Sequence, residues 1–200
     1  MHDRKVIYGI WILLLLASVL AGCQRSAPGA RFHASDVTGK FPNADFHLTD
    51  QNGTPRNLSD FRGKVVLLFF GYTHCPDVCP TTMANLSRTL RLLGKDAERV
   101  QVIFITVDPE RDTREVLAKF VPAFDRSFLG LYGDAKATAS AAKSFRADYR
   151  KVPAKKGYYM DHTALTYVID TQGKLRLLAG DREPDDWLAQ DVRLLLASTG

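Results

Sequence analysis

The stretch that decides the fold is "KVVLLFFGYTHCPDVCPTTMANLSRTLRLLG", residues 64–94. Its first part, residues 64–72, is a continuous apolar run with β-branched and aromatic side chains, which is typical of a strand buried on both faces of a parallel sheet. Pro80 suits the first position of a helix, because its missing N–H group is not needed there. The apolar residues between Met83 and Leu93 then share one helical face. The stretch therefore predicts a strand, a loop with two cysteines, and a helix.

The rest of the chain predicts further strands and helices around this unit. In chain order they are a hairpin around Asn52-Gly53 (44–58), a buried strand (100–108), a helix (113–124) whose start is signalled by Asp112 and Glu115, a short strand (128–133), a helix (134–151), a second hairpin (163–180) and a closing helix (183–198). This order predicts an α/β fold of the thioredoxin type, with a central mixed sheet flanked by helices and the first hairpin as an N-terminal β-hairpin extension. Ligands of open α/β sheets lie beyond the carboxyl ends of strands, where "THCPDVCP" and "DPERD" are both placed.

The N-terminal residues carry the pattern of a bacterial export signal. A short basic start and an apolar run end in "LAGC", residues 20–23, which resembles a lipobox. The resemblance implies a lipoprotein signal peptide over residues 1–22, cleavage before Cys23 and acylation of its thiol. An uncleaved anchor helix is the alternative, and in both cases the domain is held at the extracytoplasmic, periplasmic side of a bacterial membrane. Residues 23–40 are expected to form a flexible tether, and residues 41–200 the thioredoxin-like domain.

The composition fits one globular domain with a real core. Of the 200 residues, 46% are hydrophobic and 24% are charged, with a formal net charge of +5. No stripe of basic residues interleaved with aromatic ones is present in the sequence, so nucleic acid is not an expected partner. Residues 143–156 are rich in Lys and Arg, and two interpretations stay open: a solvated helix end and loop, or a docking face for an acidic partner or anionic lipid.

The chain has three cysteines, and only Cys75 and Cys79 remain free if Cys23 carries lipid. A disulfide between Cys75 and Cys79 would close a very short loop and remove little entropy from the unfolded chain, so a purely structural bridge is the poorer explanation. With Pro80 as the first helical residue, Cys79 would cap the helix, where the helix dipole and free N–H groups lower the pKa of a thiol. The spacing suits both a metal clamp and a redox-active disulfide.

Three motifs resemble the Sco/SenC family of copper-binding, thioredoxin-like proteins. They are "FFGYTHCPDVCPTTM" (69–83), "VDPERDT" (107–113) and "DHTALTYVID" (161–170), and they occur in the family's order. Together they place the resemblance over most of residues 41–200. The three-part match is more specific than the cysteine loop alone.

This resemblance implies a copper metallochaperone whose ligands are Cys75, Cys79 and His162. It implies delivery of copper, as Cu(I) or also as Cu(II), to the binuclear copper site in the copper-bearing subunit of cytochrome c oxidase, with other copper carriers as further partners. The ligand chemistry agrees, because thiolates are soft ligands that select Cu(I) and imidazole suits copper generally. A site with three ligands also leaves the metal accessible for transfer.

Residues beside the expected ligands receive weaker interpretations. Asp161 could orient His162 or support the ligands from behind, and it could equally be a turn residue. Asp108 ends its strand near the expected site, with a functional and a capping role both open. Met160 is expected to pack in the core, and His74 to be a solvated loop residue that tunes the thiols.

An extracytoplasmic thiol–disulfide oxidoreductase is the main alternative. Cys75 and Cys79 would then be its catalytic redox pair and would reduce the cysteines of the oxidase copper site or of another target. Redox enzymes of this fold usually place a proline before the strand that faces their cysteines, whereas "YMDHTALTYV" has no proline and a histidine instead. This difference favours a metal site. A thiol peroxidase and a copper or redox sensor are further hypotheses, and whether the protein is an enzyme stays open.

Overall fold

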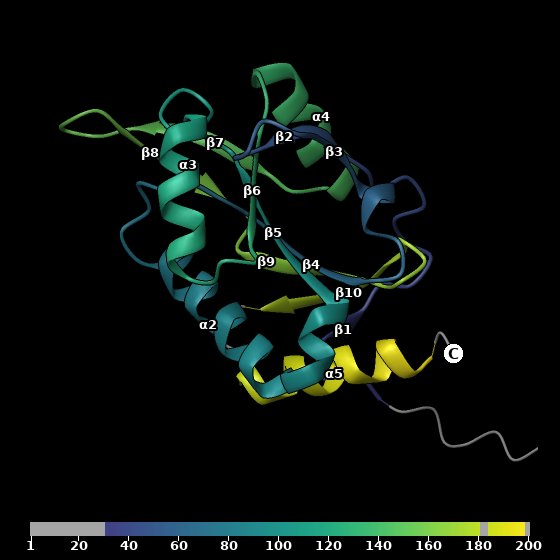
Figure 1. Cartoon of the computed structure of the whole chain (residues 1–200). Helices are drawn as coiled ribbons and strands as arrows, with labels where there is room; N and C mark the ends of the chain where they lie inside the picture. The colour runs from purple at the N-terminus through teal and green to yellow at the C-terminus, as the bar shows by residue number, and fades with distance from the viewer. Residues whose placement is uncertain (1–30, 181–183, 199–200) are drawn as a thin grey trace, which may run out of the picture. The chain divides into compact units, whose positions relative to one another are not determined.

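An eight-stranded mixed sheet runs through the centre of the protein (Figure 1). The computed structural model describes residues 31–180 and 184–198. The strands follow the order β1-β10-β9-β4-β5-β6-β2-β3, and β7 and β8 pair separately as a hairpin. The strand bounds are β1 (Ser35–Asp36), β2 (His47–Asp50), β3 (Pro55–Asn57), β4 (Val65–Gly71), β5 (Val100–Thr106), β6 (Leu129–Tyr132), β7 (Tyr149–Pro153), β8 (Tyr158–His162), β9 (Leu165–Ile169) and β10 (Leu175–Gly180).

Helices flank this sheet, as Figure 1 shows. Their bounds are α2 (Val78–Leu93), α3 (Arg114–Phe120), α4 (Ala135–Phe145) and α5 (Asp185–Ala197), with 3-10 turns η1 (Leu58–Phe61), η2 (Gly94–Arg99) and η3 (Val121–Ala123). Helices α2 and α5 pack on each other, α3 packs against β6, and α4 packs against β2. The predicted α/β architecture, with a mixed sheet between helices, is therefore confirmed.

Strands β4 and β5 form the centre of the core. All seven residues of β4 are buried, as expected for an apolar run covered on both faces. Strand β4 runs parallel to β5, and β5 runs parallel to β6. The predicted N-terminal hairpin is present as β2 and β3, and it joins the edge of the sheet antiparallel to β6. Its turn is held by the Asp50 carboxylate, which accepts the N–H groups of Asn52 and Thr54 at 2.9 Å each.

The sheet brings distant parts of the chain together at one end of its central strands. Gly71 at the end of β4 pairs with Thr106 at the end of β5, so both following loops leave the sheet side by side. On the other side of β4, Phe69 lies opposite Thr166 of the antiparallel strand β9. The start of β9 therefore lies at the same end of the sheet, three residues after His162 at the end of β8.

The predicted helix over residues 134–151 is too long. Helix α4 ends at Phe145, because Arg146 adopts a left-handed backbone conformation with φ of 52°. The N–H groups of Arg146 and Ala147 turn back to carbonyl groups in the last turn of the helix, which is a common way to end one. The following basic residues form β7, which pairs antiparallel with β8.

The chain also joins the domain earlier than the expected tether of residues 23–40 allows. Strand β1 pairs with β10, and Ala34 and Val37 on either side of it are buried in the core. The backbone N–H groups of His33 and Ala34 donate to the buried carboxylate of Asp191 in α5. The predicted signal peptide, the lipidated Cys23 and the first part of the tether lie outside the described residues. Within the described ranges, no helix combines the length and apolar character needed to cross a bilayer.

Candidate metal centre

The cysteine loop connects the end of β4 to the start of α2. The N–H group of Cys75 donates to the carbonyl group of Tyr72 at 3.3 Å, which folds the loop back on the strand end. Helix α2 begins at Val78, one residue before Cys79, so Cys79 lies inside the first turn and Asp77 is the cap residue. The N–H group of Cys79 donates to Sγ of Cys75 at 3.4 Å. Sγ of Cys75 thus accepts a free N–H group at the start of the helix. The sequence had predicted this role for Cys79.

Cys79 is fully buried, and its environment differs from the predicted one. An added methyl group at Gly71 would lie 3.1 Å from Sγ of Cys79, so the glycine leaves the space that this sulfur occupies. Burial raises the pKa of the Cys79 thiol well above its usual range, because the thiolate would lose its hydration. The predicted lowering of this pKa by the helix dipole was wrong. Without a bound cation, Cys79 is therefore a protonated thiol at neutral pH.

His162 completes the group from the other side of the chain. Its Nε2 lies 3.4 Å from Sγ of Cys79, and its Nδ1 lies 3.1 Å from the carbonyl oxygen of Thr163. A proton on Nδ1 donates to this carbonyl and leaves the Nε2 lone pair directed at the sulfur. Phe69 and Tyr72 stand edge-on to the imidazole ring, with centroid distances of 5.9 and 5.8 Å. Burial lowers the pKa of His162, which keeps the imidazole neutral and able to bind a metal.

Cys75, Cys79 and His162 form a compact set of possible ligands. Their ligand atoms all lie within 4.8 Å of one another, and no other group of three His, Cys, Asp or Glu side chains in the described ranges is placed to hold an ion. Two sulfurs and one imidazole nitrogen are a donor set that suits copper. Both cysteines are free thiols, and Cys75 is half-buried, so the group is open to solvent on the Cys75 side.

A buried carboxylate holds the start of the cysteine loop, and the sequence reasoning missed it. Both Asp112 oxygens receive hydrogen bonds from Thr73, one from its N–H group at 3.0 Å and one from its hydroxyl group at 2.5 Å. The hydroxyl group of Thr106 at the end of β5 also donates to Asp112, at 2.6 Å. The predicted helix-start role of Asp112 is wrong, because Thr113 caps α3 by accepting the N–H group of Val116. The spacing of Asp112 and Glu115 suggested a helix start, and only the fold places Asp112 beside Thr73.

Asp108 and Asp161 occupy different positions relative to the ligands. Asp108 is buried and forms an ion pair with Arg111, and it accepts the hydroxyl group of Tyr158 in β8 at 2.8 Å. It touches none of the three expected ligands and instead connects the β5–α3 loop to the hairpin that carries His162. Asp161 pairs with Arg150 at 2.8 Å on the exposed side of this hairpin, so it acts on His162 by its charge and not by contact.

Two other predictions concern residues next to the ligands. Met160 is buried in the core, as predicted. His74 is exposed, and its Nδ1 contacts the hydroxyl group of Thr73 at 3.2 Å. Beside His162, the β7–β8 hairpin forms an open depression of about 470 Å³, lined also by Asp148, Tyr149, Arg150, Asp161 and Thr163. A partner molecule can therefore approach the imidazole from the hairpin side as well as from the Cys75 side.

The unequal burial of the two thiols predicts unequal reactivity. In the reduced, metal-free protein at mildly alkaline pH, Cys75 should react with iodoacetamide at least about 10-fold faster than Cys79, because Cys79 is buried and its raised pKa keeps it protonated. Peptide mass mapping after timed quenching measures both rates. In urea the two rates should converge, and equal rates in the folded protein would contradict the described burial.

The fold and the group together define a class. The sheet is mixed and thioredoxin-like, and two thiols follow the end of its central strand. A histidine takes the place of a proline opposite them, which is the arrangement of a metal-binding variant of that fold. Comparison with known proteins identifies the family: the SCO1/SenC family model matches residues 36–197, and the chain belongs to this family.

Individual relatives support this assignment. "Protein SCO2 homolog, mitochondrial" from Homo sapiens is 38% identical over 158 residues, covering 77% of this chain and 59% of that protein, so the chain spans about three fifths of its length. Bradyrhizobium japonicum ScoI, solved with copper bound, has a TM-score of 0.71 at 43% identity, covering 76% of this chain and 98% of that one. BsSco, described as a Sco-family cytochrome c oxidase assembly protein with a disulfide switch, shares the fold at 23% identity and a TM-score of 0.66, covering 83% and 98%. The thioredoxin-like fold predicted from the sequence is confirmed.

Proposed function

We propose that this protein is a copper metallochaperone that binds copper through Cys75, Cys79 and His162. The observation that carries the proposal is the approach of three ligand atoms to within 4.8 Å of one another, with Nε2 of His162 directed at Sγ of Cys79. Family membership and a copper-bound relative at 43% identity support copper as the metal. The chemistry of the donors favours Cu(I), because two soft thiolates and one imidazole satisfy a three-coordinate ion.

The recipient is proposed to be the binuclear copper site in the copper-bearing subunit of cytochrome c oxidase. The Sco resemblance implies this target, and BsSco is described as an oxidase assembly protein. Delivery requires that an incoming ligand reach the metal. The half-buried Cys75 and the open depression beside His162 offer such access, whereas Cys79 remains covered. Exchange would then begin at Cys75 or His162 and end with the release of Cys79.

The domain is proposed to be anchored by lipid at Cys23, on the extracytoplasmic side of a bacterial membrane. The "LAGC" sequence after an apolar run supports this location, and the described domain begins only about ten residues after Cys23. An extracytoplasmic location also fits a protein whose two remaining cysteines can form a disulfide. Mass spectrometry of the protein purified from its membrane tests the anchor, because cleavage and acylation change the mass of the N-terminal peptide.

Anaerobic Cu(I) titration of the reduced protein against a competing chelator tests the site. We expect one copper per chain in the wild type and an affinity at least about 100-fold lower in His162→Ala, because even residues that only support metal ligands contribute 10- to 100-fold. His74→Ala is the matched control, since this neighbouring histidine is exposed and makes no contact with the thiols. Equal affinities of wild type and His162→Ala would reject the three-ligand site.

A thiol–disulfide oxidoreductase is the second candidate, and the unequal exposure of the cysteines favours it. An accessible Cys75 beside a buried Cys79 is an arrangement of attacking and resolving thiols. The Cys75 thiolate would attack a target disulfide and release one target thiol. Cys79 would then displace the second thiol, leaving a Cys75–Cys79 disulfide, with two electrons and two protons passed to the target. His162→Ala protein with full reductase activity and no copper binding would support this function alone.

A further inference from the structure

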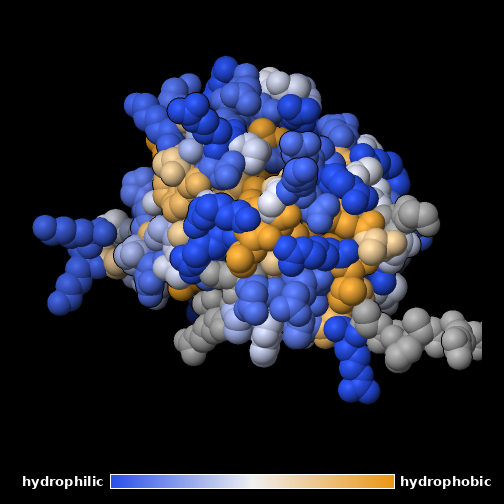
Figure 2. Space-filling model, turned by 60° about the horizontal axis from the view of Figure 1, so that its bottom comes forward, coloured by the Kyte–Doolittle hydropathy of each residue, from blue (hydrophilic) through white to orange (hydrophobic). Residues whose placement is uncertain are grey.

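The end of the molecule that carries α5 exposes apolar side chains. Within the described residues, three large apolar side chains are strongly exposed, and two of them, Leu92 and Trp187, lie in α2 and α5. Leu92 also lines an open depression of about 470 Å³ together with Arg88, Arg91 and Asp186. Figure 2 shows this end of the molecule, where apolar side chains form a patch surrounded by hydrophilic ones. Asp186 directly precedes Trp187 in α5, so Leu92 lines this depression and Trp187 lies beside it.

Basic residues surround the apolar ones on this surface. Arg88 lies one helical turn before Leu92 on the same side of α2, and Arg91 lines the same depression. The guanidinium group of Arg193 in α5 donates to the carbonyl group of Leu92. We call the set of Arg88, Arg91, Leu92, Lys95, Trp187 and Arg193 the α5-end surface. The exposed Asp186 and Glu98 and the half-buried Asp96 are acidic residues of the same elements, against the four basic residues of the set, so the net charge remains positive.

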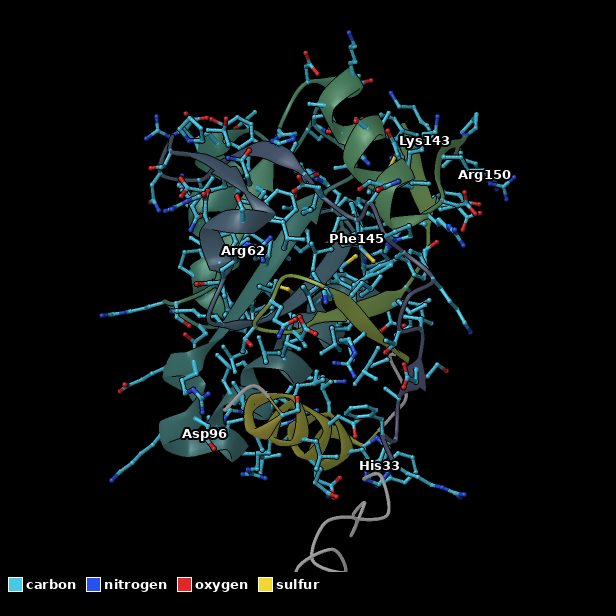
Figure 3. All side chains as sticks on the ribbon, turned by 90° about the vertical axis from the view of Figure 1, so that its right-hand side faces the viewer. His33, Arg62, Asp96, Lys143, Phe145 and Arg150 are labelled. Carbon is cyan, nitrogen blue, oxygen red and sulfur yellow. The ribbon has the colours of Figure 1, made fainter. Side chains whose placement is uncertain are left out.

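The chain enters the domain at this same end. The ring of His33 stacks on the ring of Trp187 with a centroid distance of 4.9 Å. The backbone N–H group of His33 donates to the buried carboxylate of Asp191. Figure 3 shows His33 beside α5, at the end opposite Lys143 and Arg150. His33 is ten positions after Cys23, and a fully extended chain of that length reaches at most about 36 Å. Lipid at Cys23 would therefore keep the α5 end close to the bilayer.

We propose that the α5-end surface docks on the anionic headgroup layer of the membrane that holds Cys23. The proposal rests on the lipid anchor proposed above. Tryptophan is favoured at membrane interfaces because its ring is apolar and its N–H group is polar, and arginine and lysine near an anionic leaflet are attracted to lipid phosphates. Helix α2 is 16 residues long, about 24 Å, and separates Leu92 at this end from Cys79 at the other. Docking would therefore point the Cys–Cys–His group away from the membrane, toward partners.

Tryptophan fluorescence can test this orientation. The sequence contains two tryptophans, and Trp187 alone remains after cleavage before Cys23. The mature protein is reconstituted in phosphatidylcholine vesicles, with or without phosphatidylglycerol, that contain lipid brominated near the top of the acyl chain. We expect quenching of Trp187 to be at least about twofold stronger in the anionic vesicles and to weaken with salt. The triple variant R91Q/K95Q/R193Q should lose this difference.

The control variant R150Q/K155Q/K156Q removes the same number of basic residues at the opposite end and should keep the quenching. Unquenched Trp187 in acylated protein on anionic vesicles would overturn the proposal, as would loss of quenching in the control variant alone. Equal quenching in neutral and anionic vesicles would overturn the choice of anionic headgroups. Mass spectrometry of the same sample measures acylation. Cu(I) binding by each variant shows whether the fold and the metal site are intact. Failure of the anchor or of copper binding is thus seen separately from failure of docking.

Discussion

Replacing Asp112 by Ala is expected to lower the free energy of unfolding by about 3–5 kcal/mol, an effect comparable to breaking a buried ion pair. The Asp112 side chain is fully buried and receives three hydrogen bonds, two from Thr73 and one from Thr106. The substitution leaves one backbone N–H group and two hydroxyl groups without their acceptor, and each buried donor that loses its partner costs about 1–3 kcal/mol. Urea denaturation of the metal-free, reduced protein measures the loss.

The same change should weaken copper binding, because Thr73 is two residues before Cys75. The hydrogen bonds to Asp112 connect the start of the cysteine loop to the end of β5, and they fix where the loop leaves the sheet. Asp112→Asn is the matched control. Its amide oxygen can still accept the N–H group of Thr73, so we expect a smaller loss of stability and near-normal Cu(I) affinity. Unchanged stability of Asp112→Ala would show that water replaces the carboxylate and that the loop does not depend on it.

The sequence predicted best those single strands and helices whose residues follow one continuous apolar pattern. The apolar run at residues 64–72 predicted β4 because a strand covered on both faces must be apolar at every position, and the structure buries all seven residues of β4. The cysteine positions relative to this strand followed directly. The second half of the site was different, because Cys79 and His162 are 83 residues apart and share no periodic pattern. His162 was therefore found through resemblance to a family and not through spacing.

Errors arose where a local signal competed with burial or with a distant contact. Pro80 indicated a helix start at its own position, but α2 begins two residues earlier, and burial reverses the pKa shift expected for Cys79. The basic residues after Phe145 fit a helix by composition, whereas their pairing with β8 makes them a strand. The role of Asp112 depends on Thr73, which lies 39 residues before it. Such contacts are set by the register of the sheet, which a single sequence does not reveal.

Replacing Arg111 by Met should also lower the free energy of unfolding by about 3–5 kcal/mol, because it leaves the buried Asp108 without its ion pair. The Arg111 guanidinium group also lies 3.7 Å from the centre of the Tyr158 ring and donates to the Tyr158 carbonyl group at 3.0 Å. The Tyr158 hydroxyl group in turn donates to Asp108, and burial together with this hydrogen bond raises the pKa of Tyr158 to about 12. These contacts hold β8, and with it His162, against the β5–α3 loop.

Arg111→Met should therefore reduce Cu(I) affinity at least about 10-fold although Arg111 touches none of the proposed ligands. Arg150→Met is the matched control, because Arg150 pairs with Asp161 on the same hairpin but both side chains are largely exposed; stability and affinity should change little. Adding Asp108→Asn to Arg111→Met removes the uncompensated charge and should restore part of the stability. Strictly additive losses in this double-mutant cycle would mean that the pair does not act as a unit. Normal copper affinity in Arg111→Met would mean that the paired strands β7 and β8 position His162 without this contact.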